Sequence, residues 1–169
     1  MEIGNLLQLQ YINLTWNSLT GTIYANMSYC KKLRSLSLEY NSMVGKLLPD
    51  QFSLLSKLNY LGLGRNNLTG DIGLTLPNFK VFVGVVNDFT GPIPVSLSNA
   101  SKLGILELSQ NKLTENVPTS LGQLQGLYKM NFEINSLGRN TSRDLRFLDF
   151  LVNCTSLQVL SFEDNIFGR

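Results

Sequence analysis

The chain has 169 residues, of which 43% are hydrophobic and 15% are charged, and its formal net charge is +2. This length and apolar content suit one domain with a substantial buried core. The Lys and Arg residues are spread along the sequence, which argues against a basic stripe and therefore against nucleic acid as a partner.

The N-terminal segment MEIGNLLQLQ lacks the basic segment, the apolar segment and the cleavage site of a secretory signal peptide. The longest strongly apolar run, VFVGVV at 81–86, is far shorter than the roughly 18 residues that a membrane-spanning helix needs. We therefore expect either a protein that stays inside the cell or a piece of a longer precursor. Any membrane attachment would run through segments absent from this chain.

A repeat of about 24 residues accounts for almost the whole chain. One column of the repeat is always asparagine, and we call it the asparagine ladder. The positions three, five and eight residues before this asparagine and two residues after it are apolar in every copy except at Gly84. The ladder consists of Asn17, Asn41, Asn66, Asn87, Asn111, Asn135 and Asn165.

The residues before each ladder asparagine alternate between apolar and polar, which is the period of a β-strand. A unit this short holds one strand and a return path, so it cannot enclose its own apolar side chains. Stacked units bury them between neighbours, and each buried leucine contributes roughly 1.5–3 kcal/mol. The pattern therefore predicts a solenoid whose strands form one parallel sheet.

The ladder has a mechanical explanation. The turn after each strand leaves backbone groups without partners, and an inward amide with two donors and one acceptor can satisfy them. Loss of one such side chain should cost about 1–3 kcal/mol. In four copies a glycine that permits a tight bend follows four residues later. These glycines are Gly21, Gly45, Gly70 and Gly91.

The motif N-x-L-x-G-x-I-P, preceded by L-x-x-L-x-L, is matched completely by NDFTGPIP at 87–94. Over residues 6–169 the chain resembles the plant-type leucine-rich repeats of receptor-like kinases and receptor-like proteins. The resemblance implies an α/β-type repeat solenoid, that is, a right-handed leucine-rich-repeat superhelix with a parallel concave β-sheet and an irregular or 3-10 convex side. Residues 1–169 would form a single array of about seven repeats, incomplete at both ends and without a kinase or transmembrane domain.

The last unit is longer than the others and contains RNTSRDLRFLDFLVNCTSL at 139–157. Thr141 and Asp144 fit a weak capping box, and Leu145, Leu148 and Leu151 follow at helical spacing. We predict a short helix on the convex side. An elongated repeat with FL-x-x-L-x-N-C is similar to that of a large plant receptor-kinase subfamily that includes immune receptors.

The two cysteines, Cys30 and Cys154, occupy a column that is otherwise apolar, which indicates small buried residues. They lie five rungs apart, or about 24 Å at ~4.8 Å per strand. A disulfide needs Cα atoms within about 7 Å. We therefore expect that they do not bond to each other.

Six Asn-x-Ser/Thr sequons, about twice the chance number, favour secretion when they are taken together with the resemblance. Four lie on return segments with room for a sugar. Asn13 instead lies on the predicted concave strand face, where a glycan would cover the first rung. The sequons are at Asn13, Asn26, Asn67, Asn99, Asn140 and Asn153.

The outward strand positions hold the candidate binding residues. Aromatic residues with a polar tip, which are typical interface anchors, gather on the first three rungs. Four valines on the fourth rung predict an exposed apolar patch. Alternatively, the aromatics only cap the N-terminal end, and Gly84 with a three-residue deletion distorts the fourth rung. The candidates are Tyr11, Trp16, Tyr40, Tyr60, Arg65, Val83, Val85, Glu107, Lys129 and Glu133.

Histidine is absent, which excludes Ser-His, Cys-His and His-metal sites. We predict no catalytic residue, no metal and no cofactor. A full-length relative would signal through a serine/threonine kinase that this chain does not contain.

The resemblance implies an extracellular recognition module in defence or developmental signalling. It would lie at the outer face of the plasma membrane as part of a longer protein, or be secreted. Its partners would be a peptide, glycan-derived or protein ligand and a co-receptor. Two alternatives are a secreted inhibitor of a microbial wall-degrading enzyme and a truncated, non-functional paralogue.

Overall fold

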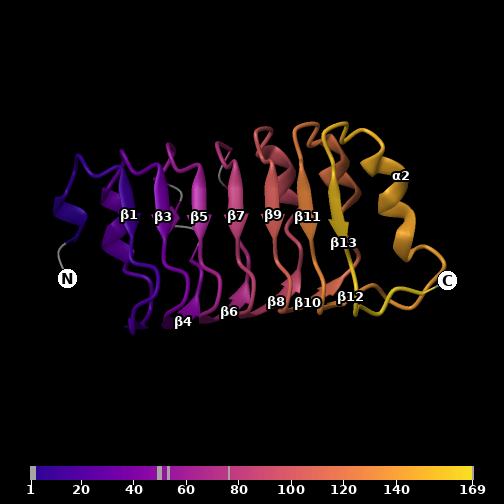
Figure 1. The fold of residues 1–169 in the computed structure, drawn as a ribbon, viewed down its shortest axis with the longest axis horizontal. Helices are drawn as coiled ribbons and strands as arrows, with labels where there is room; N and C mark the ends of the chain where they lie inside the picture. Colours follow the sequence, from indigo (N-terminus) through magenta and orange to yellow (C-terminus); the bar gives the residue numbers. More distant parts are fainter. Residues whose placement is uncertain (1–2, 49–50, 53, 76, 169) are drawn as a thin grey trace.

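The computed structural model describes residues 3–48, 51–52, 54–75 and 77–168. Seven short strands stand side by side in one row (Figure 1), and each pairs in parallel with the next. The predicted parallel sheet is therefore confirmed. Its strands are β1 (Tyr11–Asn13), β3 (Ser35–Ser37), β5 (Tyr60–Gly62), β7 (Val81–Val83), β9 (Ile105–Glu107), β11 (Lys129–Asn131) and β13 (Val159–Ser161).

A second parallel sheet, absent from the sequence prediction, runs along the lower edge in Figure 1. It is built from the segment after each ladder asparagine, where only a glycine bend was expected. Met43, Leu68 and Leu113 are buried, whereas the residues on either side of them are not. The alternation of a β-strand therefore continues through this segment. Its strands are β2 (Thr20–Gly21), β4 (Ser42–Lys46), β6 (Asn67–Asp71), β8 (Asp88–Pro92), β10 (Lys112–Glu115) and β12 (Ser136–Leu137).

Short helices cover the convex side, as the resemblance implied. They are η1 (Ile3–Asn5), η2 (Ala25–Tyr29), η3 (Val95–Asn99), η4 (Thr119–Gln123), η5 (Asp144–Phe147) and α2 (Leu148–Leu151), of which all but α2 are 3-10 helices. None of the helices in the described part of the chain has the length and apolar character needed to cross a lipid bilayer.

The short helix predicted in the elongated last unit is present as η5 followed directly by α2. Its buried face agrees with the leucine spacing only in part. Leu151 is buried, but Leu145 and Leu148 are exposed, and Phe147 is buried instead of them. The Phe147 ring packs edge-on against Phe162, with 4.9 Å between the ring centroids. Leucine spacing alone does not reveal this aromatic contact, which decides how the helix is rotated.

Asp144 stabilises the loop of this last unit by hydrogen bonds. Its carboxylate accepts the backbone N–H groups of Arg139, Thr141 and Gly168 at 2.9, 3.0 and 3.0 Å, and the Thr141 hydroxyl at 2.6 Å. Burial opposes ionisation of this carboxyl, but the four hydrogen bonds outweigh burial and hold its pKa below the ordinary value. Thr141 and Asp144 are thus hydrogen-bonded as the predicted capping box requires, but they do not cap η5, because Arg143 occupies its N-cap position and makes no side-chain capping bond.

Burial of the apolar columns depends on the rung that follows. Leu36, Leu61 and Leu106 occupy one column in inner rungs, and they are 0% exposed. Leu160, in the same column of the last rung, is 42% exposed. The difference shows that the leucines are hidden by the next rung rather than by their own, as the stacking argument requires.

Gly84 is the one position without a side chain in the apolar columns, and neighbouring side chains fill the space beside it. A Cβ at Gly84 would lie 2.9 Å from Leu108 Cδ2 and 3.2 Å from Phe89 Cε2. Phe82 and Phe89 are fully buried, and β7 stays in register with β5 and β9. The fourth rung is therefore not distorted, because large aromatic side chains occupy the space of the missing leucine.

Each inner ladder asparagine joins its own rung to the preceding one. The Asn66 amide donates to the carbonyls of Leu63 in its own rung and Leu38 in the preceding rung, both at 3.0 Å. Its oxygen accepts the Met43 N–H at 3.0 Å. The same three bonds recur at Asn41, Asn87, Asn111, Asn135 and Asn165. The predicted ladder is confirmed, and it links rungs as well as closing turns.

The two cysteines are buried and free, as predicted. The Cys30 thiol donates to the Ile3 carbonyl at 3.3 Å, and the Cys154 thiol donates to the Leu121 carbonyl at 3.5 Å. Burial raises the pKa of both thiols, which keeps them protonated at neutral pH.

Replacement of Asn87 by alanine should lower the free energy of unfolding by about 1–3 kcal/mol, because buried backbone groups of two rungs lose their partner. Asn17→Ala is the matched control. Asn17 is exposed and bonds to carbonyls of its own rung, so its loss should cost less than about 1 kcal/mol. Urea unfolding followed by circular dichroism measures both, and equal losses would contradict the cross-rung role.

Candidate recognition surface

The residue directly before each ladder asparagine has a left-handed backbone. Its φ lies between 53° and 58° in all seven rungs, although no glycine occurs there. For a residue with a Cβ this conformation costs roughly 1–2 kcal/mol, so the surrounding hydrogen bonds must hold it. The side chains in this column therefore project from the solenoid in a similar direction on successive rungs. They are Trp16, Tyr40, Arg65, Val86, Gln110, Ile134 and Asp164.

The first three members of this column form a continuous stack, which we call the Trp16–Tyr40–Arg65 stack. The ring centroids of Trp16 and Tyr40 are 3.6 Å apart with 14° between the ring planes, and Arg65 Cζ lies 5.2 Å from the centroid of Tyr40. Such contacts contribute about 0.5–1.5 kcal/mol each. Trp16 nevertheless remains 72% exposed. The stack is thus an ordered aromatic and cationic surface that is open to solvent.

Tyr60 belongs to a separate network centred on Glu39. Its hydroxyl donates to Glu39 Oε1 at 2.7 Å, and the Thr15 hydroxyl donates to Glu39 Oε2 at 3.3 Å. Gly62 makes room for this carboxylate, because a Cβ there would overlap it. Burial, together with the hydrogen bond to Glu39 and its negative charge, raises the pKa of Tyr60 to about 12. Tyr60 is therefore a half-buried, restrained residue rather than a free anchor.

Two other predicted groups are not part of the stack. Tyr11 on β1 is well exposed, and no ring contact between described residues joins it to Trp16 or Tyr40. The prediction of an exposed valine patch on the fourth rung is wrong, because Val83 and Val85 are half-buried. Both valines lean into the space beside Gly64, where a Cβ would lie 3.1 Å from Val85 Cγ1 and 3.5 Å from Val83 Cγ1.

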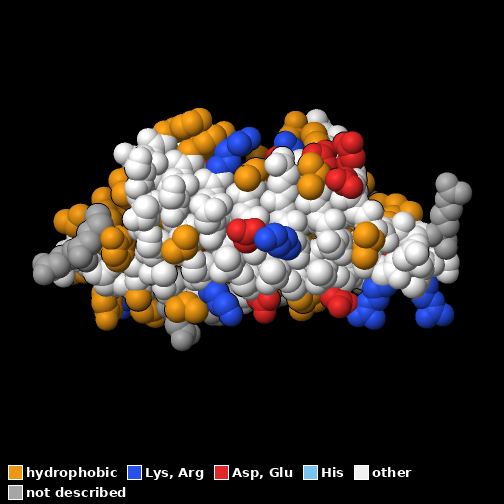
Figure 2. Space-filling view, turned by 90° about the horizontal axis from the view of Figure 1, so that it is seen from below, with side chains coloured by type: hydrophobic (Ala, Val, Ile, Leu, Met, Phe, Trp, Pro, Cys, Tyr) orange, Lys and Arg blue, Asp and Glu red, His pale blue; other side chains and the backbone are white. Residues whose placement is uncertain are grey.

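The C-terminal half of the concave face is acidic and partly paired. Lys129 forms an ion pair with Glu107, and Glu133 accepts a hydrogen bond from the Ser161 hydroxyl. Figure 2 shows hydrophobic side chains toward the N-terminal end of its upper margin and acidic side chains toward the C-terminal end. The predicted candidates therefore divide into an aromatic group on the first three rungs and a charged group on the later ones.

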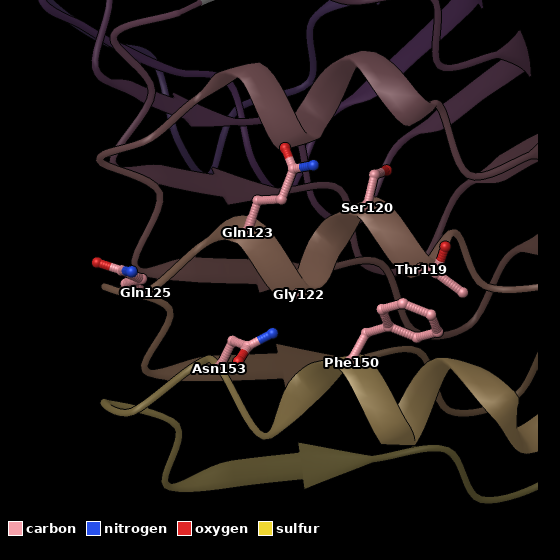
Figure 3. A pocket seen from close by; sticks show the side chains of 7 residues that line it. All are labelled: Thr119, Ser120, Gly122, Gln123, Gln125, Phe150 and Asn153. Atoms are coloured by element: carbon pink, nitrogen blue, oxygen red, sulfur yellow. The ribbon is translucent and has the colours of Figure 1, made fainter.

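A groove of about 440 Å³ lies on the convex side between η4 and α2 (Figure 3). Gly122 permits this close approach of the two helices, because a Cβ there would overlap the Phe150 carbonyl. No charged side chain lines the groove, and no three His, Cys, Asp or Glu residues of the described chain gather where they could hold a metal ion. The groove therefore offers polar contacts rather than reactive groups. Its lining residues are Thr119, Ser120, Gly122, Gln123, Gln125, Phe150 and Asn153.

The sequons differ in accessibility. Three on return segments are exposed as expected, namely Asn99, Asn140 and Asn153. Asn26 in η2 is half-buried, so the expectation of free space there is wrong. Asn13 is exposed on β1, but its side-chain oxygen accepts the Thr15 N–H at 3.1 Å. Attachment of a sugar at the Asn13 amide nitrogen would leave this acceptor in place but would cover the concave surface of the first rung.

Comparison with known proteins finds similar repeats in plant receptor-like proteins. A family model described as Leucine Rich Repeat matches residues 102–124. The chain is similar to Receptor-like protein 32 of Arabidopsis thaliana, with 31% identity over 159 residues that cover 79% of the chain and 18% of that protein. The leucine-rich repeats of this chain are homologous to those of plant receptor-like proteins.

Solved receptor ectodomains share the fold of this leucine-rich-repeat chain. The structure of PEPR1–AtPEP1 superposes with a TM-score of 0.86 at 30% identity, over 96% of this chain and 22% of that chain. The Arabidopsis receptor kinase HAESA, in complex with the peptide hormone IDA and the co-receptor SERK1, superposes with a TM-score of 0.84 at 28% identity, over 94% and 26%. The chain thus spans only a minor part of each relative, and the leucine-rich-repeat solenoid predicted from its sequence is confirmed.

Tyr60 should ionise near pH 12, against about 10 for an ordinary tyrosine. Because the folded state favours the neutral phenol, this stabilising contribution is fully present below about pH 10 and is lost as the pH rises toward 12. Tyrosinate absorbance during alkaline titration measures the effect. Tyr60→Phe should remove the last step of the curve and Glu39→Gln should move it to lower pH, whereas an unchanged curve in Tyr60→Phe would disprove the assignment.

If the chain is expressed through a secretory pathway, Asn99 and Asn153 should carry glycans, and Asn26 should be modified much less because it is half-buried beside buried Ser28. Mass spectrometry of peptides after enzymatic deglycosylation measures occupancy at each site. Ser101→Ala removes the Asn99 sequon alone and serves as the control. Occupancy of Asn26 equal to that of Asn99 would contradict the burial argument.

Proposed function

We propose that this chain is the recognition part of an extracellular plant receptor-like protein or receptor kinase ectodomain. It would hold a peptide or protein partner on its concave face, with the Trp16–Tyr40–Arg65 stack as the anchor. The observation that supports this most directly is that the three side chains are ordered against one another while Trp16 stays 72% exposed. Interface anchors combine these two properties.

The stack suits recognition because it is preformed. The side chains are already held in one arrangement by their mutual contacts, so binding of a partner would cost little conformational entropy for ordering them. Trp16 presents a ring for an apolar group, and Arg65 keeps guanidinium donors for an acceptor on the same partner. The rungs of Trp16 and Arg65 are two steps apart, or roughly 10 Å at ~4.8 Å per strand. This spacing suits an extended ligand segment.

The class of partner follows from the relatives. The HAESA structure contains a peptide hormone and a co-receptor. Since this chain shares that fold, we propose a peptide as the ligand and a second receptor protein that docks at the edge of the concave face. Signalling would then depend on parts of the receptor, or on a partner kinase, outside residues 1–169.

Replacement of Trp16 or Tyr40 by alanine should weaken partner binding by about 1 kcal/mol or more each, or roughly fivefold. The probe is a library of synthetic secreted plant peptides passed over the immobilised chain, with each hit measured by biolayer interferometry. Tyr24→Ala removes a tyrosine that is exposed elsewhere on the coil and is the matched control. Unchanged affinity in Trp16→Ala and Tyr40→Ala, or an equal loss in Tyr24→Ala, would remove the stack from the binding site.

A further inference from the structure

A row of cations follows the flank of the solenoid that leads into the concave strands, at the upper edge of Figure 1. Its members lie seven to ten residues before a ladder asparagine on four successive rungs, and all are exposed. We call this set the basic flank. It consists of Lys31, Lys32, Arg34, Lys57, Lys80 and Lys102.

Stacking of the rungs gathers charges that are scattered in the sequence. The Asn59 N–H donates to the Arg34 carbonyl at 2.9 Å, and the Lys80 N–H donates to the Asn59 carbonyl at 2.8 Å. Arg34, Asn59 and Lys80 are therefore hydrogen-bonded neighbours on three successive rungs, about 4.8 Å apart. Arg34, Lys57, Lys80 and Lys102 border one hollow, so these charges lie together on the surface.

The basic flank has no counter-charge of its own. The segments 31–34, 56–59, 77–80 and 101–104 contain no Asp or Glu. None of the ion pairs formed between described residues involves a member of the flank. An unneutralised line of cations attracts an extended polyanion in a salt-dependent manner.

Hydrogen-bonding groups lie among these cations. A hollow of about 360 Å³ is bordered by four of the cations together with Ser56, Asn59 and Asn78. The Asn78 amide donates to the Ser56 carbonyl at 2.8 Å, which orients its side-chain oxygen as an acceptor. The surface therefore offers positive charges for an anion and neutral polar groups for hydroxyls.

We infer that the basic flank binds an acidic polysaccharide, a linear chain of uronic acid units. The lysine ammonium groups would pair with the recurring carboxylates, while Asn59, Asn78 and Ser56 would bond to sugar hydroxyls. The step from rung to rung is close to the length of one pyranose unit in an extended chain, so consecutive sugars would meet at least one cation on each of the four rungs, with Asn59 and Asn78 between them. The site lies on the flank and is separate from the proposed concave anchor.

The surface is less suited to other polyanions. Single-stranded nucleic acid is bound by exposed aromatic platforms, and the one aromatic residue in these four segments, Phe79, is buried. Phosphate recognition favours arginine forks, whereas the flank holds a single arginine. Insertion into a bilayer needs exposed apolar groups, and the leucines of these segments, Leu33, Leu58 and Leu103, are buried.

The test uses polygalacturonate as the probe and biolayer interferometry as the measurement, at low and at high salt. The triple variant Lys57→Gln/Lys80→Gln/Lys102→Gln should bind at least about tenfold more weakly than the unaltered chain, with salt reducing the difference. Lys46→Gln/Arg143→Gln/Arg146→Gln removes the same charge from other exposed positions and should stay within about twofold. Circular dichroism melting curves should match for all three proteins, and fully methyl-esterified polymer should bind weakly.

Equal weakening in the two triple variants would overturn the inference, because net charge alone would then explain binding. Equal binding of the esterified polymer would also overturn it. Tight binding of a single-stranded oligonucleotide or of anionic lipid vesicles, with no response to polygalacturonate, would assign the flank to another partner. Trp16→Ala should leave polygalacturonate binding unchanged, which keeps this result distinct from a failure of the proposed concave anchor.

Discussion

The hydrogen bonds of the ladder amides couple the course of the backbone to the burial of the leucines. Each inner amide contacts carbonyls of two rungs and an N–H of the earlier one. The asparagine of the following rung therefore bonds backbone groups of each inner rung, and the same following rung hides the apolar column, as the contrast between Leu106 and Leu160 shows. The amide also lies next to the residue held in a left-handed conformation. One side chain thus connects core stability to the direction of the outward column that forms the candidate anchor.

The fold could be read from the sequence because its determinants recur. Seven copies of the same columns predicted the solenoid, the parallel sheet, the ladder and the buried cysteines. The second sheet was missed, although the alternation past the ladder asparagine, as at Met43, was a usable signal. The rotation of the last helix could not be predicted from Leu145 and Leu148, because the contact between Phe147 and Phe162 decides it.

The candidate site was only partly predictable, because its details arise between residues about 24 positions apart. The aromatic residues of the first three rungs could be predicted, because they occupy outward positions of the repeat in the sequence. The restraint of Tyr60 by Glu39 needs the space left by Gly62, and the half-burial of Val85 needs the space left by Gly64. Lys57 and Lys80 likewise look isolated in the sequence and border the same hollow only when the rungs are stacked.

The cross-rung geometry of the ladder also bears on how such a chain can evolve. Duplication or loss of one whole unit leaves every amide with an equivalent partner, so recombination between copies can lengthen, shorten or reorder the coil without a new fold. An insertion that shifts an asparagine relative to its strand breaks this equivalence at once. The fourth unit, three to four residues shorter than its neighbours yet still in strand register, shows that length changes survive where they fall on the return path. Diversity in what the outward columns recognise can therefore accumulate by shuffling of units, while the amide contacts preserve the scaffold.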